Sequence, residues 1–141
     1  MIVLKVLPDE FSLYQLPKET KLPINEILAL PWYTISKTTS ELSLLLPSAI
    51  QPSWFTEENG KKEEGWRALQ VDAQMDFSLV GILASIIDPL RDHGIAVFCI
   101  STFDTDYILV KQQSIDETIT VLKKQSNIEL KSGTSVLEED N

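Results

Sequence analysis

At 141 residues the chain can form one compact domain or two small subdomains, and its 43% hydrophobic content is typical of a globular protein. Its formal net charge of −9 excludes DNA and RNA as main partners, because nucleic-acid affinity comes largely from clustered Lys and Arg, and the sequence has no such cluster. The acidity is interpreted as a solubility feature rather than as a means of recruiting a basic partner.

The single cysteine, Cys99, lies inside an apolar run, which excludes an intrachain disulfide and a cysteine-based metal site. We expect a buried, inert thiol rather than a nucleophile. The N-terminal apolar run is too short for a signal peptide, and no stretch approaches the roughly 18 to 20 apolar residues of a membrane span. These features predict a cytoplasmic protein with no membrane attachment.

The first part of the chain is expected to form short strands and one short helix. Residues Pro8-Asp9-Glu10 separate two apolar runs, which predicts two strands with a tight connection, and prolines bracket a segment that allows at most two helical turns. The expected elements are strands at Ile2–Leu7 and Phe11–Leu16, a helix within Ile24–Leu30, and a hairpin of Trp32–Thr38 and Glu41–Leu46.

The next segment, residues 47–64, mixes proline, glycine and charge, and is interpreted as a linker that Trp54 and Phe55 hold against a core surface. Beyond it, apolar residues recur three and four positions apart from Leu79 to Leu90, which predicts an amphipathic helix. Ser78 is its expected N-cap, and Gly94 suits the left-handed residue after a helix. Pro89 is expected to kink or shorten this helix.

The residues around this helix complete the pattern. Ser114 and Glu117 have the spacing of a capping box, which predicts the start of a second helix. Runs of β-prone residues predict strands at Trp66–Val71, Ala96–Phe103, Tyr107–Val110 and Ile128–Leu130, with Asp104-Thr105-Asp106 as a tight turn. The order βαββαβ predicts an α+β, ferredoxin-like fold, in which an antiparallel sheet carries both helices on one face.

The two halves of the chain resemble each other. The hairpins align at an offset of about 65 residues, which pairs Ile35-Ser36 with Ile100-Ser101, and the preceding strands, FSLYQL and WRALQV, align at an offset of 55. We interpret the chain as two tandem copies, the first of them truncated. The expected division is residues 1–62, residues 63–131 and a mobile acidic tail over residues 132–141.

Four stretches, GWRALQV, DFSLVGILASIIDPL, GI and ISTFDTDYILV in that order, closely resemble the tandem ACT-domain proteins related to aspartate kinase regulatory regions, a family that includes cytosolic arginine sensors. The stretch LKVLPDEFSLYQLP, followed by WYTISKTTSELSLLLP, resembles the family's first, truncated ACT unit. The resemblance implies ferredoxin-like units that pair through sheets or helices. It also implies small effectors, often amino acids, bound at an interface between units.

The resemblance implies two candidate ligand-binding segments. In the first, a loop leads into a helix, where backbone N–H groups suit a carboxylate. In the second, a hairpin turn offers a hydroxyl, an apolar wall and an anion, at Thr102, Phe103 and Asp106. The candidate residues are Asp76, Phe77, Ser78, Leu79, Val80 and Gly81 in the first segment, and Ser101, Thr102, Phe103, Asp104 and Asp106 in the second.

Each candidate also has a purely structural interpretation. Asp76 can be an ordinary helix cap, Gly81 a packing glycine in the first helical turn, and Asp104 and Asp106 residues that stabilise the turn. Nothing supports catalysis, because His93 has no triad partner and the two aspartates lack a third ligand or a phosphate loop. We therefore expect no enzyme, no metal and no cofactor.

The sequence and the resemblance together predict a non-catalytic regulatory or sensor protein. Its expected ligand is a small-molecule effector, probably an amino acid by the resemblance, bound at an interface between ACT units of a homodimer. The alternative is a structural dimerisation module whose ligand pocket is vestigial.

Overall fold

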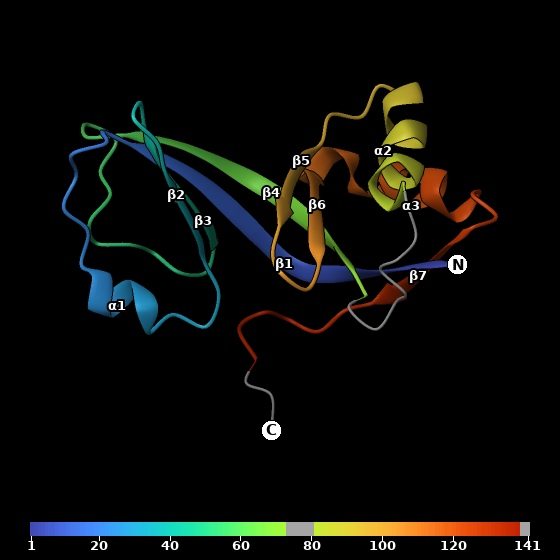
Figure 1. Cartoon of the computed structure of the whole chain (residues 1–141), viewed down its shortest axis with the longest axis horizontal. Helices are drawn as coiled ribbons and strands as arrows, with labels where there is room; N and C mark the ends of the chain where they lie inside the picture. The colour runs from blue at the N-terminus through green and yellow to red at the C-terminus, as the bar shows by residue number, and fades with distance from the viewer. Residues whose placement is uncertain (73–80, 139–141) are drawn as a thin grey trace. The chain divides into compact units, whose positions relative to one another are not determined.

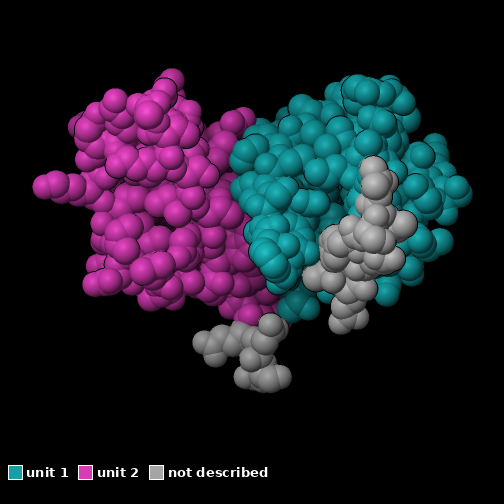
Figure 2. Space-filling model, viewed as in Figure 1, with its two compact units in different colours: residues 1–8, 66–134 teal, residues 9–65, 135–141 magenta. Residues whose placement is uncertain are grey.

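The computed structural model describes residues 1–72 and 81–138. The chain forms two compact units, which Figure 2 distinguishes by colour. Unit 1 comprises residues 1–8 and 66–134, and unit 2 comprises residues 9–65 and 135–141. This division differs from the expected one, because the first eight residues pack with the second half of the chain.

Unit 1 has the predicted βαββαβ order (Figure 1). Its sheet also contains the first part of the chain's N-terminal strand. Within the unit the strand order is β7-β1-β4-β6-β5, so β1 lies between β7 and β4. The elements are β1 (Ile2–Leu16), β4 (Lys61–Val71), α2 (Ile82–Asp92), β5 (Phe98–Ser101), β6 (Asp106–Lys111), the short 3-10 helix η1 (Gln112–Ser114), α3 (Ile115–Lys123) and β7 (Ile128–Ser132).

Both helices of unit 1 pack on the same face of its sheet. Leu69 of β4 pairs with Ile108 of β6, and alternate residues of each strand point to one face. These side chains form a single core with Ile86 of α2 and Leu122 of α3, and all four are fully buried. The predicted α+β, ferredoxin-like fold is therefore confirmed.

The predicted break in the first strand is wrong, because β1 is one continuous strand of 15 residues. Proline's fixed φ lies within the extended region, and its missing N–H is tolerated where a strand makes no ladder bond, so Pro8 can stay in the strand. Beside it, the Arg67 guanidinium donates to the Leu7 carbonyl at 3.0 Å. The start of β1 pairs in parallel with β7, from Ile2 to Val6, so this sheet is not wholly antiparallel.

The helix ends of unit 1 correct one predicted cap and confirm another. Helix α2 begins at Ile82 and contains Pro89, so the proline does not end it. Gly94 has the predicted left-handed φ of 69° after the helix. Ser114 makes no capping bond. The chain enters α3 through η1, so Ser114 already has helical backbone angles, whereas a capping residue needs an extended backbone. The other predicted cap, Ser78, lies outside the described residues.

Unit 2 combines strands of the same sheet, including the first residues of β4, with one short helix. Its core contains Tyr14, whose ring lies 5.7 Å from that of Trp54 and 4.9 Å from that of Phe55, so these two aromatics hold residues 47–60 as predicted. The predicted linker ends earlier than expected, because residues 61–64 already belong to β4. The remaining elements are α1 (Ile24–Leu28), β2 (Thr34–Lys37) and β3 (Leu42–Pro47), with β3 between β2 and β1.

The two hairpins correspond at an offset of 64 residues, one fewer than predicted. This offset takes both strands of the first hairpin, β2 and β3, onto β5 and β6. The predicted offset of 55 for the preceding strands is confirmed, because Phe11 pairs with Pro47 in unit 2 as Trp66 pairs with Lys111 in unit 1. A one-residue shift exchanges the two faces of a strand but leaves its composition unchanged, so an alignment by residue type did not fix the hairpin register.

The C-terminal residues are attached to β1 rather than free, as far as Val136. The Gly133 N–H donates to the Val6 carbonyl at 2.8 Å in unit 1. In unit 2 the Asp9 carboxylate accepts from the Ser135 hydroxyl at 2.7 Å and from the Val136 N–H at 3.2 Å. This contrasts with the mobile tail expected from residue 132 onward.

Candidate functional site

The first candidate segment is described only at its last residue. Asp76, Phe77, Ser78, Leu79 and Val80 lie outside the described residues. Gly81 has a φ of 83° and precedes Ile82, the first residue of α2. A Cβ built on it would meet no atom within 4 Å, so the glycine provides a left-handed backbone rather than tight packing.

The second candidate segment forms the tip of the β5–β6 hairpin. Ser101 pairs with Asp106 across the strands, and the Ser101 hydroxyl donates to the Asp106 carboxylate. The turn is closed by the Thr102 N–H, which donates to the Thr105 carbonyl at 2.8 Å. The Thr102 hydroxyl accepts from the Thr105 N–H at 3.2 Å, so it already has a structural role. Ser101, Thr102 and Asp106 thus lie together at the hairpin tip.

The other two predicted residues of this tip face solvent. Asp104 is exposed, and Phe103 is the most exposed of the large apolar side chains of the described chain. Phe103 therefore forms no wall beside Asp106 in the structure. An aromatic ring in this position is available to a ligand or to another protein surface.

Thr105 lies within the second candidate segment but was not predicted as a ligand contact, and it anchors the tip. It is 7% exposed, and its hydroxyl donates to the carbonyl of Val71, the last residue of β4. This bond fastens the hairpin tip to the point where the chain enters the first candidate segment. A threonine between two aspartates is a common turn pattern, and nothing local in the sequence distinguishes this anchoring role.

Cys99 packs against the helix-covered core of unit 1, and is partly buried. Burial raises the pKa of its thiol, and the negative charge of Asp106 raises it further. Both effects disfavour the thiolate that a nucleophilic cysteine requires. The structure thus agrees with the inert thiol expected from the sequence.

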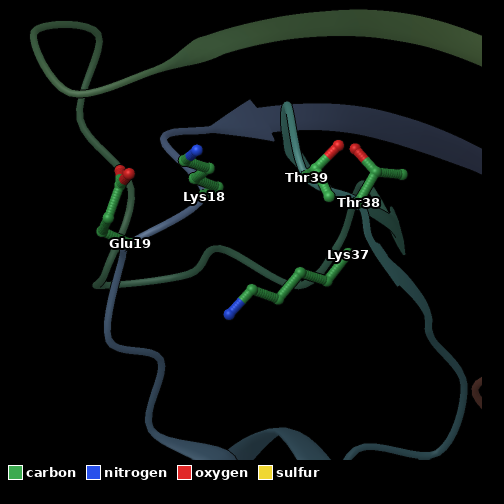
Figure 3. Close-up of a pocket in the computed structure, with 5 residues that line it drawn as sticks. All are labelled: Lys18, Glu19, Lys37, Thr38 and Thr39. Atoms are coloured by element: carbon green, nitrogen blue, oxygen red, sulfur yellow. The ribbon is translucent and has the colours of Figure 1, made fainter.

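A hollow of about 580 Å³ in unit 2 was not predicted from the sequence. It is lined by residues after β1 and by the tip of the β2–β3 hairpin (Figure 3). Its residues are scattered between positions 18 and 39, so no local motif identifies it. The lining residues are Lys18, Glu19, Lys37, Thr38 and Thr39.

Among the described residues, no three His, Cys, Asp or Glu side chains come close enough together to hold a metal ion. No helix in the described ranges is long and apolar enough to cross a membrane.

Comparison with known proteins relates this chain to regulatory proteins. Over 121 residues it is 28% identical to the mouse cytosolic arginine sensor for mTORC1 subunit 1, and 27% identical to the human one. Each match covers 82% of this chain but only 36% of the relative, so the chain spans about a third of the length of these curated proteins.

The solved structures agree with the fold. Protein Atu0741 from Agobacterium tumefaciens is 25% identical, with a TM-score of 0.75 over 94% of this chain and 96% of that one. The regulatory subunit of aspartate kinase from Thermus thermophilus has a TM-score of 0.61 at 5% identity, over 89% of this chain and 99% of that one. The latter likeness shows the fold alone.

Residues 61–124 match the ACT domain family model, and they cover β4, α2, both strands of the second hairpin and α3. This segment of the chain is thus similar to an ACT domain; the chain is similar in sequence to the cytosolic arginine sensors, and similar in fold to the aspartokinase subunits.

Proposed function

We propose that the chain is a non-catalytic, cytoplasmic regulatory protein that binds an amino acid at an interface between ACT units of a homodimer. The family match and the sensor relatives support a regulatory role. The proposed ligand contacts combine the loop of Asp76, Phe77, Ser78, Leu79, Val80 and Gly81 with the hairpin tip of Ser101, Thr102, Phe103, Asp104 and Asp106.

One observation carries the proposal: the hairpin tip presents a fixed carboxylate beside the end of β4. The Ser101 hydroxyl orients Asp106, and Thr105 ties the tip to Val71, so Asp106 is held in place before a ligand arrives. The Asp106 carboxylate has further acceptor capacity, which suits an ammonium or guanidinium group. Fixing the receptor group beforehand lowers the entropy cost of binding.

Regulation would follow from linkage. A ligand that contacts two ACT units at once favours the arrangement in which both contacts are made. Binding then shifts the association of the units, and association shifts the ligand affinity by the same factor. The exposed Phe103 ring is an apolar surface that a change in the association of the units can cover or expose.

The test is a thermal-shift screen of the twenty amino acids, followed by calorimetric titration of each hit. A ligand specific for the folded state raises the melting temperature by mass action. We expect a saturable hit whose affinity falls about tenfold or more in Asp106→Asn, because a charge-assisted hydrogen bond is lost. Asp116→Asn, on the exposed surface of α3, is the matched control and should bind as the native chain does.

If the chain is instead a structural dimerisation module, no amino acid should raise its melting temperature. A dimer that forms by sedimentation analysis and responds to none of the twenty amino acids at millimolar concentration would favour that alternative. A monomer that binds an amino acid would refute the homodimer while leaving the sensor role in place.

A further inference from the structure

The loop that joins β3 to β4 in unit 2 ends in the dipeptide Asn59-Gly60. The two other internal asparagines, Asn25 and Asn127, are followed by glutamate and isoleucine. An asparagine side chain can react with the backbone nitrogen of the next residue, and a following glycine has no side chain to obstruct the approach. The sequence therefore makes this dipeptide the place where an asparagine of the chain can cyclise most easily.

Gly60 is required by the packing of unit 2. A Cβ built on it would lie 2.5 Å from the Gln15 carbonyl oxygen and 2.8 Å from the Leu16 Cδ2 atom. Its φ is not among the positive ones, so the need for glycine comes from this close approach to the end of β1 rather than from a left-handed backbone. The fold therefore keeps a glycine after Asn59, whatever its chemical cost.

The Asn59 side chain is held on the residues that precede it. Its Oδ1 accepts from the Thr56 N–H at 2.8 Å, and its Nδ2 donates to the Trp54 carbonyl at 3.2 Å. The Asn59 N–H donates to the Thr56 carbonyl at 3.1 Å and to the Thr56 hydroxyl at 3.3 Å. Both atoms of the side-chain amide are thus engaged, although Asn59 is exposed to solvent. A reaction that removes Nδ2 has to break its bond to Trp54.

We propose that Asn59 is a site of spontaneous deamidation, and that the turn of residues 54–59 controls its rate. The Gly60 nitrogen loses its proton to a solvent base and forms a bond to Asn59 Cγ, while the Cγ–Nδ2 bond breaks and the amide nitrogen leaves as ammonia. Water then adds to one of the two carbonyls of the five-membered imide and opens the ring. The products are aspartate and an isoaspartyl linkage, in which the main chain runs through the former side-chain carbonyl carbon. Water is the only co-reactant.

Both products disturb the turn. A carboxylate in place of the amide has no hydrogen to donate to the Trp54 carbonyl, so two acceptor oxygens face each other. An isoaspartyl linkage lengthens the main chain by one carbon beside Gly60, where the close approach to Gln15 leaves no space. The Trp54 ring packs 5.7 Å from that of Tyr14, against the core of unit 2. Deamidation therefore loosens a segment that these aromatic rings hold in place.

The first test is incubation of the full chain at mildly alkaline pH, followed by peptide mapping with mass spectrometry. Deamidation raises the mass of the affected peptide by one unit, and chromatography separates its aspartyl and isoaspartyl forms. We expect both forms at Asn59, while Asn25 and Asn127, which are also exposed, stay unmodified over the same period. No mass gain at Asn59, or an equal gain at all three asparagines, would overturn the assignment.

Thr56→Val tests whether the turn controls the rate. It removes the hydroxyl that accepts from the Asn59 N–H, so the turn should open more often and Asn59 should deamidate roughly two- to tenfold faster. Thr39→Val, at an exposed threonine outside the turn, should leave the rate unchanged. In concentrated urea the native chain and both variants should react at one common rate, faster than that of the folded native chain. Equal rates for the folded native chain and Thr56→Val, or no acceleration in urea, would refute control by the turn.

Asn59→Asp reproduces the aspartyl product and tests its effect on the fold. It should lower the melting temperature by about 2 °C, because it removes one hydrogen bond of the turn. Asn25→Asp makes the same change in net charge at an exposed residue in the first turn of α1, where a carboxylate is favourable, and should not lower it. An unchanged melting temperature in Asn59→Asp would refute the loosening. None of these results depends on the ligand proposed for unit 1.

Discussion

The two hairpin tips of the molecule share one backbone design but differ in charge. In each, a threonine begins a four-residue loop, and its N–H donates to the carbonyl of the fourth residue, at 2.9 Å from Thr38 to Glu41 and at 2.8 Å from Thr102 to Thr105. Each threonine hydroxyl also accepts backbone N–H groups inside its loop. The turn therefore depends on the threonine, and the other positions are free to differ.

Those other positions determine what each tip can bind. The strand residue before the loop is Lys37 in unit 2 and Ser101 in unit 1, and the residue after it is Leu42 in unit 2 and Asp106 in unit 1. The tip of unit 2 thus offers an ammonium group, from Lys37, beside the carboxylate of Glu41, whereas the tip of unit 1 offers carboxylates alone. The comparison teaches that a repeated backbone can present different chemistry, so the truncated unit need not be only a support.

The largest expected effect on stability comes from comparing a buried aromatic ring of unit 2 with an exposed one of unit 1. Phe11 is fully buried, with its ring 5.0 Å from that of Trp32. Phe11→Ala should lower the free energy of unfolding by ~3 to 5 kcal/mol, measured by urea denaturation, because it leaves a cavity in the core. Phe103→Ala, at an exposed ring, should change it by less than about 0.5 kcal/mol. Similar losses in both variants would contradict the burial described for unit 2.

The second largest effect is expected at Thr105, whose hydrogen bond to Val71 distinguishes the tip of unit 1 from that of unit 2. Thr105→Val removes a buried hydroxyl and leaves the Val71 carbonyl without that donor, which should cost ~1 to 3 kcal/mol of unfolding free energy. The equivalent residue in unit 2, Glu41, is partly exposed, and Glu41→Gln should cost less than about 0.5 kcal/mol. Hydrogen exchange should also become faster at the β5–β6 tip in Thr105→Val. Unchanged exchange there would show that the tip does not need its anchor.

The smallest expected effect on stability is at the residues that precede the two helices α1 and α2. Helix α2 follows Gly81 at a φ of 83°, whereas α1 follows Pro23 at a φ of −75°. Gly81→Ala should cost ~1 kcal/mol, because an L side chain strains a left-handed backbone, and Gly81→Asn should cost less, because asparagine tolerates this conformation. Pro23→Ala should cost about 0.5 kcal/mol through a more flexible unfolded chain. Thermal unfolding that ranks Asn below Ala at position 81 would contradict the left-handed assignment.

The local elements could largely be predicted from the sequence. The strands around α2 and both hairpins lie near the positions that β-prone runs predicted, because this signal acts over a few residues. The turn of the second hairpin was misplaced: it spans residues 102–105, and Asp106 already belongs to β6 rather than to the predicted turn Asp104-Thr105-Asp106. The exceptions were local sequence patterns that are compatible with two different local structures. Pro8 could end a strand or stay within one, and Ser114 could cap α3 or lie inside the preceding 3-10 turn. In both cases the surrounding structure selected the outcome.

The candidate sites divide in the same way. A hairpin at Ser101 to Asp106 could be predicted, but the pairing of Ser101 with Asp106 could not, because the predicted turn placed Phe103 and Tyr107 on its two sides. The anchoring role of Thr105 could not be predicted either, since its acceptor, Val71, is 34 residues away. The same holds for the hollow of unit 2, which Lys18 and Lys37 both line only after β1, β2 and β3 pair.

By itself the sequence determined the α+β class, the βαββαβ order and the presence of two related hairpins, because periodicity and turn chemistry are properties of neighbouring residues. Tertiary structure alone decided that β1 continues through Pro8 and lies between β7 and β4, and that the hairpins match at 64 residues. It also placed two lysines at one hollow. These outcomes depend on which distant strands pair, and pairing is selected by the burial of whole faces, which no short stretch of sequence encodes.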